Sequence, residues 1–314
     1  MASSPNLSEI LTTTLRNRSR QLADNLSNHN ALLQRMREQG TQPTVTGRDI
    51  VRELEYAANS TVQFYQGYET LNVEPSDVLS AAVFDYKQMA GNVTISGLEQ
   101  IKNSGVQAII NLLEARINVL EKSLMNTLAT SLYSDGTGTD GKEIGGLQLI
   151  IADGGTGTVG GINSSTFTFW QNQQTTATSS AFSTTNVQAD MNNMYLLLVR
   201  GADAPDLIMA DANAYKAFLG SLQAIQRITS DDLARSGFTS VQYLNSDVVY
   251  DDQCPTNKMY FLNTQYLRLE VAEGRDFVPG EAKMSVNQDA LVTPMFWSGN
   301  LTCSNRALQG VIHV

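Results

Sequence analysis

A glycine-rich stretch in the middle of the chain has the spacing of a nucleotide-binding motif. Gly155-Thr156-Gly157-Thr158-Val159-Gly160 matches GxGxxG and follows an apolar run at 147–151, which predicts a strand. This spacing cradles a dinucleotide pyrophosphate where a helix starts at the glycines and supplies its N-terminal N–H groups. The motif therefore raises the hypothesis of an NAD-binding oxidoreductase.

The residues after the glycines do not support that hypothesis. The segment INSSTFTFW (162–170) is β-branched, serine-rich and aromatic, unlike the start of a helix. The first acid after the motif is Asp190, too distant for the ribose-binding acid of a dinucleotide fold. Ile162, not a lysine, follows Gly161, so a Walker-type phosphate loop is also disfavoured. We expect a tight turn here and keep the oxidoreductase only as a disfavoured alternative.

Other residues that could do chemistry are few and scattered. The two histidines are His29, near the start, and His313, the penultimate residue. They exclude a multi-histidine metal site and leave a catalytic triad without a well-placed base. Asp251, Asp252 and Cys254 could hold a metal, but the proline-containing turn around them favours a solvated hairpin tip.

The stretch SDGTGTDG (134–141) resembles the opening of a calcium loop. It lacks the regular acid spacing and the closing glutamate of an EF-hand, so calcium is disfavoured. The glycine motif, the two histidines and the stretch 134–141 each lack the rest of a functional site. The sequence therefore predicts no catalytic residues, no cofactor-binding residues and no metal ligands. We expect the protein not to be an enzyme.

Composition and charge narrow the class of protein further. The 314 residues are 42% hydrophobic and 17% charged, which is typical of a folded chain. The formal net charge of −10 disfavours gripping nucleic acid through its phosphates. A basic cluster near the N-terminus is a local exception, for which a solvated helix face is favoured over an anion-binding arm. Its members are Arg16, Arg18, Arg20, Arg35 and Arg37.

The cysteines and the apolar runs indicate in which cellular compartment the protein folds. Cys254 and Cys303 form no CxxC pair and are too few for a disulfide framework, so we expect reduced, partly buried thiols. The start of the chain has no signal-peptide pattern, and no apolar run reaches the roughly 18 residues that span a bilayer. We expect a protein that is made and folded in the cytoplasm.

The first half of the chain predicts three unlike segments. Residues 1–40 predict a polar arm whose thin apolar stripe at helical spacing needs a partner surface. Residues 50–95 predict an extended, strand-rich excursion that includes one or two helical turns at 52–57. The excursion has too few large aliphatic residues for a core, so it should project and pack on something else. Residues 101–132 predict a long helix, which the glycines and acids of 134–146 end.

The second half predicts short mixed elements. We expect a helix at 186–201, then a buried strand at 205–211 and a helix capped by Asp211 or Asn213. Residues 247–271 predict two strands joined by a Pro-Thr-Asn turn, and residues 290–314 predict another strand pair. This mixed α+β order lacks strict βαβ alternation, which disfavours a doubly wound sheet.

Several of these stretches together resemble the major capsid proteins of tailed double-stranded-DNA bacteriophages, which share the HK97 fold. The resemblance covers about residues 45–314 and rests on the order of its pieces. YAANSTVQFYQGYETLNV (56–73) and SAAVFDYKQMAGNVTISGLEQIKNSG (80–105) resemble the extended loop and its return into the long helix. Further pieces are similar to the spine helix and its turn (111–147), the glycine loop (157–172) and the axial domain (205–218 and 260–271).

The resemblance implies an α+β, HK97-like capsid fold in five parts. These are an N-terminal arm (1–48), an extended β loop (49–95), a peripheral domain with the spine helix (96–185), an axial domain (186–285) and C-terminal strands returning to the core (286–314).

The same resemblance implies a shell-forming function. The chain would be a major head protein that self-assembles through pentamers and hexamers into an icosahedral capsid. It would enclose double-stranded DNA without sequence-specific binding or membrane contact. It would lie in the virion, and in the host cytoplasm during assembly. An acidic wall would let the packaged DNA slide. An encapsulin-like nanocompartment shell protein shares the fold and is the alternative.

The chain departs from the family pattern in two respects. About 45 residues precede the extended loop, too few for the N-terminal scaffolding segment of some relatives. We therefore expect a separate scaffolding protein, and a portal and a decoration protein are further candidate partners. Lys87 is the loop candidate for a lysine–asparagine crosslink, but nothing marks a partner asparagine or an activating glutamate. An uncrosslinked shell is expected.

Overall fold

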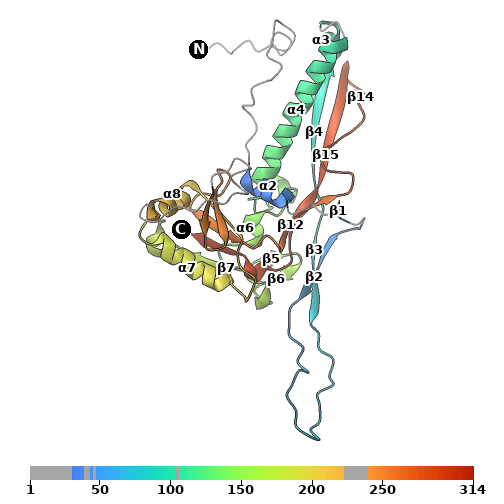
Figure 1. Cartoon of the computed structure of the whole chain (residues 1–314). Helices are drawn as coiled ribbons and strands as arrows, with labels where there is room; N and C mark the ends of the chain where they lie inside the picture. Colours follow the sequence, from blue (N-terminus) through green and yellow to red (C-terminus); the bar gives the residue numbers. More distant parts are fainter. Residues whose placement is uncertain (1–29, 39–42, 45–46, 103–105, 223–239) are drawn as a thin grey trace.

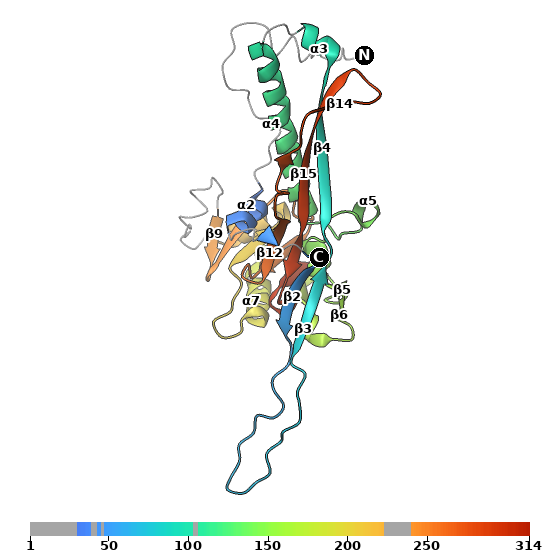
Figure 2. The same cartoon turned by 90° about the vertical axis from the view of Figure 1, so that its right-hand side faces the viewer.

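The computed structural model describes residues 30–38, 43–44, 47–102, 106–222 and 240–314. In Figure 1 a compact lobe of strands and helices lies beside a long helix and long strands that rise above it. An extended loop hangs below, at the opposite end, and Figure 2 shows the same elongated outline from the side. The body therefore carries two projections that point away from each other.

The upper projection is built on a long helix, α4 (Val106–Ser131), preceded by a short helix, α3 (Gly97–Lys102). Leu124 and Leu128, four residues apart, lie on its buried face. At 1.5 Å per residue its 26 residues give a length of about 39 Å. The long helix predicted for 101–132 is confirmed within the described residues.

After α4 the chain turns sharply through α5 (Gly138–Gly141) into α6 (Leu147–Ile150). The strand expected at 147–151 is therefore wrong. Leu147, Ile150 and Ile151 are fully buried, and their spacing of three and four residues fits one face of a helical turn. A short apolar run alone does not distinguish the two structures.

A six-stranded sheet forms around one long strand, β15 (Ala290–Cys303). β4 runs antiparallel along it, in register from Ala290↔Ser96 to Gly299↔Lys87, and α4 packs on β4. β12 pairs antiparallel with the other end of β15. The remaining bounds are β1 (Pro43–Thr44), β4 (Lys87–Ser96), β12 (Leu267–Ala272), β13 (Val278–Pro279) and β14 (Lys283–Met284).

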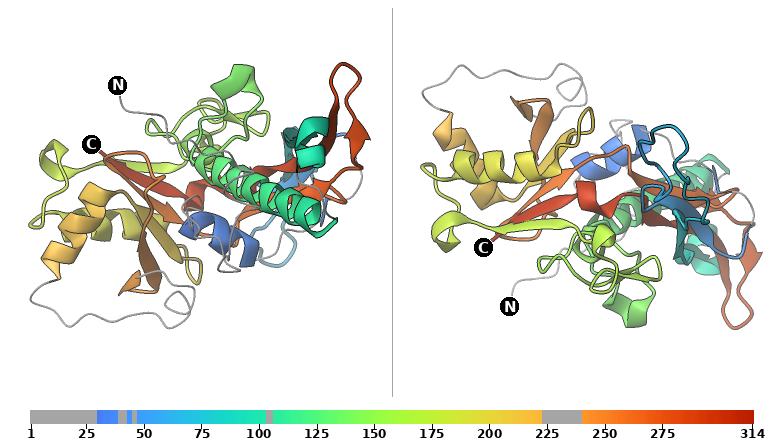
Figure 3. Two further views of the ribbon diagram at one scale, coloured as in Figure 1. Left: turned by 90° about the horizontal axis from the view of Figure 1, so that it is seen from above. Right: turned by 90° about the horizontal axis from the view of Figure 1, so that it is seen from below.

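The lobe contains a second six-stranded sheet in the order β7-β16-β11-β8-β10-β9, whose central strand β8 is buried on both faces. Ile208 and Ala210 of β8 pack in the cluster of α7 (Val187–Leu198) and α8 (Ala212–Ser221), whereas Leu207 and Met209 pack in the main core. Figure 3 shows α7 and α8 side by side on one side of the lobe. The strands are β7 (Gln173–Thr176), β8 (Leu207–Ala210), β9 (Ser240–Tyr243), β10 (Ser246–Tyr250), β11 (Lys258–Leu262) and β16 (Gly310–His313).

The expectations for this lobe are mostly confirmed. The buried strand within 205–211 and the helix within 186–201 are present. Asp211 caps α8, because its Oδ1 accepts a hydrogen bond from the backbone N–H of Ala214 at 2.9 Å.

Two predicted strand pairings are wrong. β10 and β11 do not pair with each other, because β8 lies between them, parallel to β10 and antiparallel to β11. β15 and β16 lie in different sheets, and the turn η3 (Arg306–Leu308) precedes β16. Strand neighbours along the sequence are a default that tertiary packing overrides here.

Two antiparallel strand pairs and two 3₁₀ turns complete the fold. β2 (Ile50–Glu55) and β3 (Leu79–Phe84) form an antiparallel ribbon at the root of the extended loop. The helical turns expected at 52–57 are therefore wrong, because Ile50 and Leu54 are buried while Val51 is exposed, as a strand requires. The other elements are β5 (Thr158–Val159), β6 (Ile162–Asn163), η1 (Thr168–Trp170) and η2 (Thr178–Ser180).

The described part of the N-terminal segment is the helix α2 (Ala31–Glu38), which packs on α4 and β12. Leu32 and Met36 are fully buried there. This stretch therefore finds its partner surface on its own chain, whereas residues 1–29 lie outside the described part. None of the described helices combines the length and the apolar character that crossing a membrane requires.

Candidate assembly surface

The extended loop, residues 56–78, presents large apolar side chains to solvent. Phe64 and Tyr68 are fully exposed, and Val62 and Val73 are more than 80% exposed. In Figure 2 the loop extends well beyond the β2–β3 ribbon, with no other element beside it. So many large exposed apolar side chains on one loop indicate an interaction surface.

Local hydrogen bonds shape the loop. At its tip the backbone N–H of Gln66 donates to Glu69 Oε2 at 3.0 Å, next to Gly67, whose φ is +62°. Two asparagines form Asx turns, Asn59 with Thr61 at 2.9 Å and Asn72 with Glu74 at 3.0 Å. The loop therefore has defined turns although its apolar side chains have no cover.

The loop is also acidic. It contains Glu69, Glu74 and Asp77 and has no lysine or arginine between residues 56 and 78. Its surface therefore combines aromatic side chains with negative charge, which suits a partner surface that carries cations.

The root of the loop is firmly attached to the body. Leu54, Ala82 and Phe84 of the β2–β3 ribbon are buried in the main core. Arg52 forms an ion pair with Glu270 of β12, and its Nε donates to Thr302 Oγ1 at 3.3 Å. The loop thus projects from a fixed base.

The glycine motif forms part of that base. β5 and β6 pair as a hairpin whose turn residues, Gly160 and Gly161, have φ values of +59° and +78°. The backbone N–H of Val83 donates to Gly160 O at 2.9 Å, and a Cβ on Gly160 would lie 2.7 Å from the Ala82 Cβ. The glycines open a hairpin rather than a helix, so the tight turn is confirmed and its role is to contact β3.

Asp190 does not have the role of a ribose-binding acid. It is buried at the start of α7, where its carboxylate accepts hydrogen bonds from Thr178 N at 3.1 Å and Thr178 Oγ1 at 2.6 Å. Its hydrogen bonds join η2 to α7.

Arg306 is a charged side chain that is fully buried, and it was not among the candidates from the sequence. It donates to the neutral acceptors Ser164 Oγ at 3.0 Å, Asn172 Oδ1 at 2.9 Å, Trp170 O at 3.2 Å, Thr156 O at 3.5 Å and Ile150 O. Burial lowers the pKa of Arg306 to about 10, so the guanidinium stays charged near neutral pH. Arg306 therefore holds the glycine loop in place, and no sequence pattern marks it.

Asp251 corrects the expectation of a solvated hairpin tip. It is only 3% exposed, and its carboxylate accepts hydrogen bonds from Tyr133 Oη at 2.8 Å and Gln253 N at 3.0 Å. Asn30 Nδ2 lies 3.0 Å from Oδ1 and 2.8 Å from Oδ2. Burial raises the pKa of Asp251, and the hydrogen bonds from Gln253 and Tyr133 oppose the shift. Through these hydrogen bonds Asp251 links α2, the end of α4 and the lobe.

The remaining chemical candidates are dispersed. Cys254 and Cys303 are both free and buried, and burial raises the pKa of Cys254 well above its usual range and that of Cys303 to about 12. Both thiols are therefore protonated and poor nucleophiles. His313 lies on β16, with Nε2 3.2 Å from Gln174 Oε1, whereas His29 lies outside the described residues.

Within the described ranges, no three His, Cys, Asp or Glu side chains come together as metal ligands would. Asp252, next to Asp251, is exposed. In the calcium-like stretch 134–141, Asp135 Oδ1 accepts hydrogen bonds from Thr137 N at 2.9 Å and Thr137 Oγ1 at 2.7 Å. That carboxylate shapes a turn.

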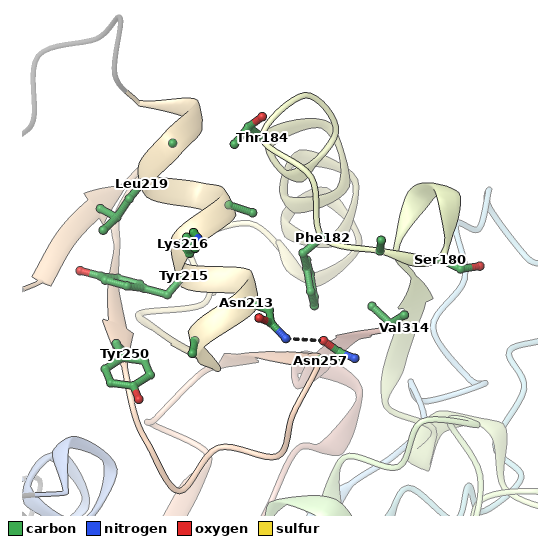
Figure 4. A pocket seen from close by; sticks show the side chains of 14 residues that line it. Ser180, Phe182, Thr184, Asn213, Tyr215, Lys216, Leu219, Tyr250, Asn257 and Val314 are labelled. Atoms are coloured by element: carbon green, nitrogen blue, oxygen red, sulfur yellow. Dashed lines mark hydrogen bonds between the residues drawn. The ribbon is translucent and has the colours of Figure 1, made fainter.

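An open groove of about 870 Å³ lies on the lobe between α8, the segment 180–184 and the end of the chain (Figure 4). Tyr215 and Lys216 lie on the α8 wall, and Phe182 and Val314 lie on the opposite side. Asn213 Nδ2 donates to Asn257 Oδ1 at 2.9 Å across its floor. The groove holds one charged side chain and no acid–base pair.

Comparison with known proteins places the fold. Neither the protein-family models nor the curated proteins give a match to the sequence. Among solved structures, the chain is similar to the capsid subunit of cyanophage A-1(L), with 15% identity, 98% of both chains covered and a TM-score of 0.68.

Two further structures support the same fold. The holo-SrpI encapsulin of Synechococcus elongatus is 10% identical, with 97% of this chain and 94% of that chain covered and a TM-score of 0.64. The capsid of Myoviridae phage XM1 is 10% identical over 96% and 97%, with a TM-score of 0.59. The chain therefore has the HK97-like fold of viral capsid and encapsulin shells, as predicted from its sequence.

Proposed function

We propose that the chain is a major capsid protein whose copies assemble into the icosahedral shell of a tailed double-stranded-DNA phage. The observation that carries this proposal is the loop at 56–78, whose exposed Phe64 and Tyr68 find no packing on their own chain. A neighbouring copy would cover them. The HK97-like fold supports the proposal, because capsid subunits of phages share it.

Assembly by identical copies follows from the same feature. A loop that packs on the next subunit makes a head-to-tail contact, and such contacts close into rings when a whole number of copies completes one full turn. Pentamers and hexamers would be those rings. The ribbon of β2 and β3 supplies a fixed base for the contact.

We infer a structural role rather than catalysis. The buried Cys254 and Cys303 thiols are protonated, Asp251 is hydrogen-bonded in the interior, and the glycine motif supports a hairpin. Each of these groups serves packing or hydrogen bonding within the fold.

The five-part division of the chain remains part of the proposal. The arm would comprise 1–48, the loop 49–95, the peripheral domain 96–185, the axial domain 186–285 and the returning strands 286–314. β4 is the last strand of the loop segment 49–95. It pairs with β15 and therefore belongs to the six-stranded sheet on which α4 packs.

Partners and location are proposed on the same basis. A separate scaffolding protein and a portal would act during assembly in the host cytoplasm, and a decoration protein could cover the virion surface. The shell would enclose DNA without sequence-specific contacts, as its net charge of −10 suggests. We also propose that the shell is uncrosslinked, because Lys87 Nζ donates to Gly141 O at 2.6 Å within its own subunit. Monomer bands alone on denaturing gels of purified particles would support this.

An encapsulin-like nanocompartment is the second candidate, favoured by the TM-score of 0.64 to the SrpI shell. The contents of purified particles distinguish the two: packaged DNA indicates a capsid, whereas an enclosed enzyme indicates an encapsulin.

Negative-stain imaging of the purified chain, alone and with its neighbouring gene products, tests shell formation. A variant with Phe64→Ser and Tyr68→Ser should lose closed particles and keep the wild-type melting temperature. Phe167→Ser, at a half-exposed phenylalanine outside the loop, is the matched control and should keep them. Particles that form equally well with both loop aromatics removed would contradict the proposal.

A further inference from the structure

A second cavity, of about 260 Å³, lies between the C-terminal end of α4, the start of β4 and the turn that follows α4. Met89 of β4 pairs with Trp297 of β15, and Lys87, two residues before Met89, lies on the same face of the sheet. Leu128 of α4 and Ile144 of the turn add apolar walls. Pockets for drug-sized ligands span roughly 300–1,000 Å³, so this cavity suits a smaller organic molecule.

Two lysines at this cavity have no acidic partner. Lys87 Nζ donates to a neutral carbonyl, Gly141 O, at 2.6 Å, and Lys142 is exposed. Neither lysine forms an ion pair with a described residue. The acid that lines the same cavity, Glu143, accepts hydrogen bonds from two hydroxyl groups of its own turn, at 3.0 and 3.1 Å. The two ammonium groups therefore favour an incoming carboxylate.

The cavity is also lined by an unused hydrogen-bond donor. Trp297 is 2% exposed, and its Nε1 has no acceptor among the described residues. Trp170, the other tryptophan of the chain, donates to Val159 O at 3.0 Å. Because a buried N–H without an acceptor is unfavourable, a ligand oxygen within reach of this indole would be bound favourably.

We propose that this cavity is a binding site for a small amphipathic carboxylate, a linear acid of about six to eight carbons. Its carboxylate lies at Lys87 and Lys142, and one of its oxygens accepts the unpaired indole N–H. Its chain packs against Met89, Leu128 and Ile144. The cavity lies within one subunit, so the site does not depend on the proposed shell function.

Titration of the full-length chain with sodium octanoate, followed by calorimetry and tryptophan fluorescence, tests the site. We expect one molecule per chain, a dissociation constant of about 1 mM or tighter and a saturable change in emission, because Trp297 lines the cavity. Butyrate has a shorter chain and should bind at least about tenfold more weakly. The absence of saturable octanoate binding would overturn the inference.

Two further probes separate the carboxylate from its chain and its charge. Octylamine has a chain of the same length but a positive charge, and it should not bind beside the two lysines. Inorganic phosphate has the charge without the chain and should not displace octanoate. Octylamine that binds as tightly as octanoate, or phosphate that displaces it, would overturn the inference.

Substitution of the lysines locates the carboxylate. Lys87→Met should weaken octanoate binding about tenfold, and Lys142→Met should weaken it about threefold because this side chain is exposed. Lys216→Met, at a lysine on the lobe groove, is the matched control and should bind octanoate as wild type does. Wild-type affinity in the Lys87→Met protein would overturn the inference.

Protection of the lysines in the wild-type chain gives a test that needs no variant to fold. Octanoate should slow the acetylation of Lys87 and Lys142 by acetic anhydride, as measured by mass spectrometry of peptides. It should leave the acetylation of Lys216 unchanged. Equal acetylation of Lys87 with and without octanoate, or the same protection at Lys216, would overturn the inference.

Discussion

Asn30 and Asp251, 221 residues apart, meet through hydrogen bonds from one side-chain amide to both carboxylate oxygens, at 3.0 and 2.8 Å. Asn30 also caps α2, because its Oδ1 accepts from Leu33 N at 2.8 Å. Tyr133 Oη completes the cluster from the end of α4. One buried carboxylate thus fixes the first described helix, the end of the long helix and the lobe relative to one another.

Removing that amide should loosen α2. Asn30→Ala loses both the cap and the bonds to a charged acceptor, and we expect the free energy of unfolding to fall by about 2–4 kcal/mol. Asn30→Ser keeps a capping oxygen and should lose less. Chemical denaturation measures both, and Asp252→Asn, at the exposed neighbour of Asp251, is the control. Equal stability of Asn30→Ala and wild type would show that the cluster contributes nothing.

The raised pKa of Asp251 predicts that the free energy of unfolding depends on pH in a defined direction. The carboxyl is protonated more readily in the folded than in the unfolded chain, where its pKa is about 3.9. Its contribution to stability is therefore largest below that value and decreases as the pH rises through the folded pKa. The buried groups beside it, Tyr133 and Cys254, remain protonated over this range, and the like charge of the neighbouring Asp252 adds to the upward shift of its pKa.

Denaturation of wild type and Asp251→Asn between about pH 4 and pH 7 measures this contribution. The free energy of unfolding of wild type minus that of Asp251→Asn should decrease as the pH rises. The contributions of the other titrating groups are common to both proteins and cancel in this difference. A flat difference would contradict the shift.

The two turn glycines give a matched pair of variants. At Gly160, a Cβ meets Ala82 at 2.7 Å and the φ is +59°, so Gly160→Ala should combine overpacking with backbone strain and cost about 2–4 kcal/mol. At Gly161 the φ is +78° but the space is open, so Gly161→Ala should cost about 1–2 kcal/mol. Thermal melting compares them. The same cost at both positions would mean that contact with β3 is unimportant.

Arg306 should be among the least replaceable side chains. Arg306→Met leaves the acceptors of Ser164, Trp170 and Asn172 without their donor in the interior, and we expect a loss of about 3–5 kcal/mol. Arg200→Met, at an exposed arginine, should change stability by less than about 0.5 kcal/mol. Denaturation and proteolysis within residues 156–172 would measure the difference. A soluble Arg306→Met protein of wild-type stability would refute the role.

The sequence predicts the regular elements of this fold better than their partners. The long helix and the buried strand at 207–210 follow from periodicity, and Asp211 follows from capping chemistry. The pairing of β10 and β11 with β8 does not follow, because strand order depends on contacts between distant segments. The one-turn helix α6 does not follow either, because a short segment with three apolar residues, Leu147, Leu149 and Ile150, fits both a strand and a helical turn.

The same contrast holds for the candidate assembly surface: the sequence predicts some of its features and not others. The exposed loop is visible in the sequence as a strand-rich stretch without enough aliphatic residues for a core. The burial of Asp251 and the hub at Arg306 are not visible, because each depends on acceptors or donors more than 100 residues away. A polar residue next to a turn signal is exposed by default, and tertiary packing reverses that here.

The ion pair between Glu99 and Arg116 predicts acid sensitivity at the upper end of the long helix. Arg116 Nη2 donates to Glu99 Oε1 at 2.9 Å and Nη1 donates to Thr94 O at 2.6 Å, so one side chain joins α3, α4 and β4. The hydrogen bond from Arg116 lowers the pKa of Glu99 to about 2. A depressed carboxyl pKa stabilises the fold above its unfolded value of about 4.3, and this contribution is lost as the pH falls toward 2. Arg116→Gln should therefore raise the pKa of Glu99 toward 4, as measured by carboxyl NMR titration, and reduce the difference in melting temperature between about pH 6 and pH 3. Arg48→Gln, at an exposed arginine, should leave that pKa unchanged, and a Glu99 pKa near 2 in the Arg116→Gln protein would assign the shift to another cause.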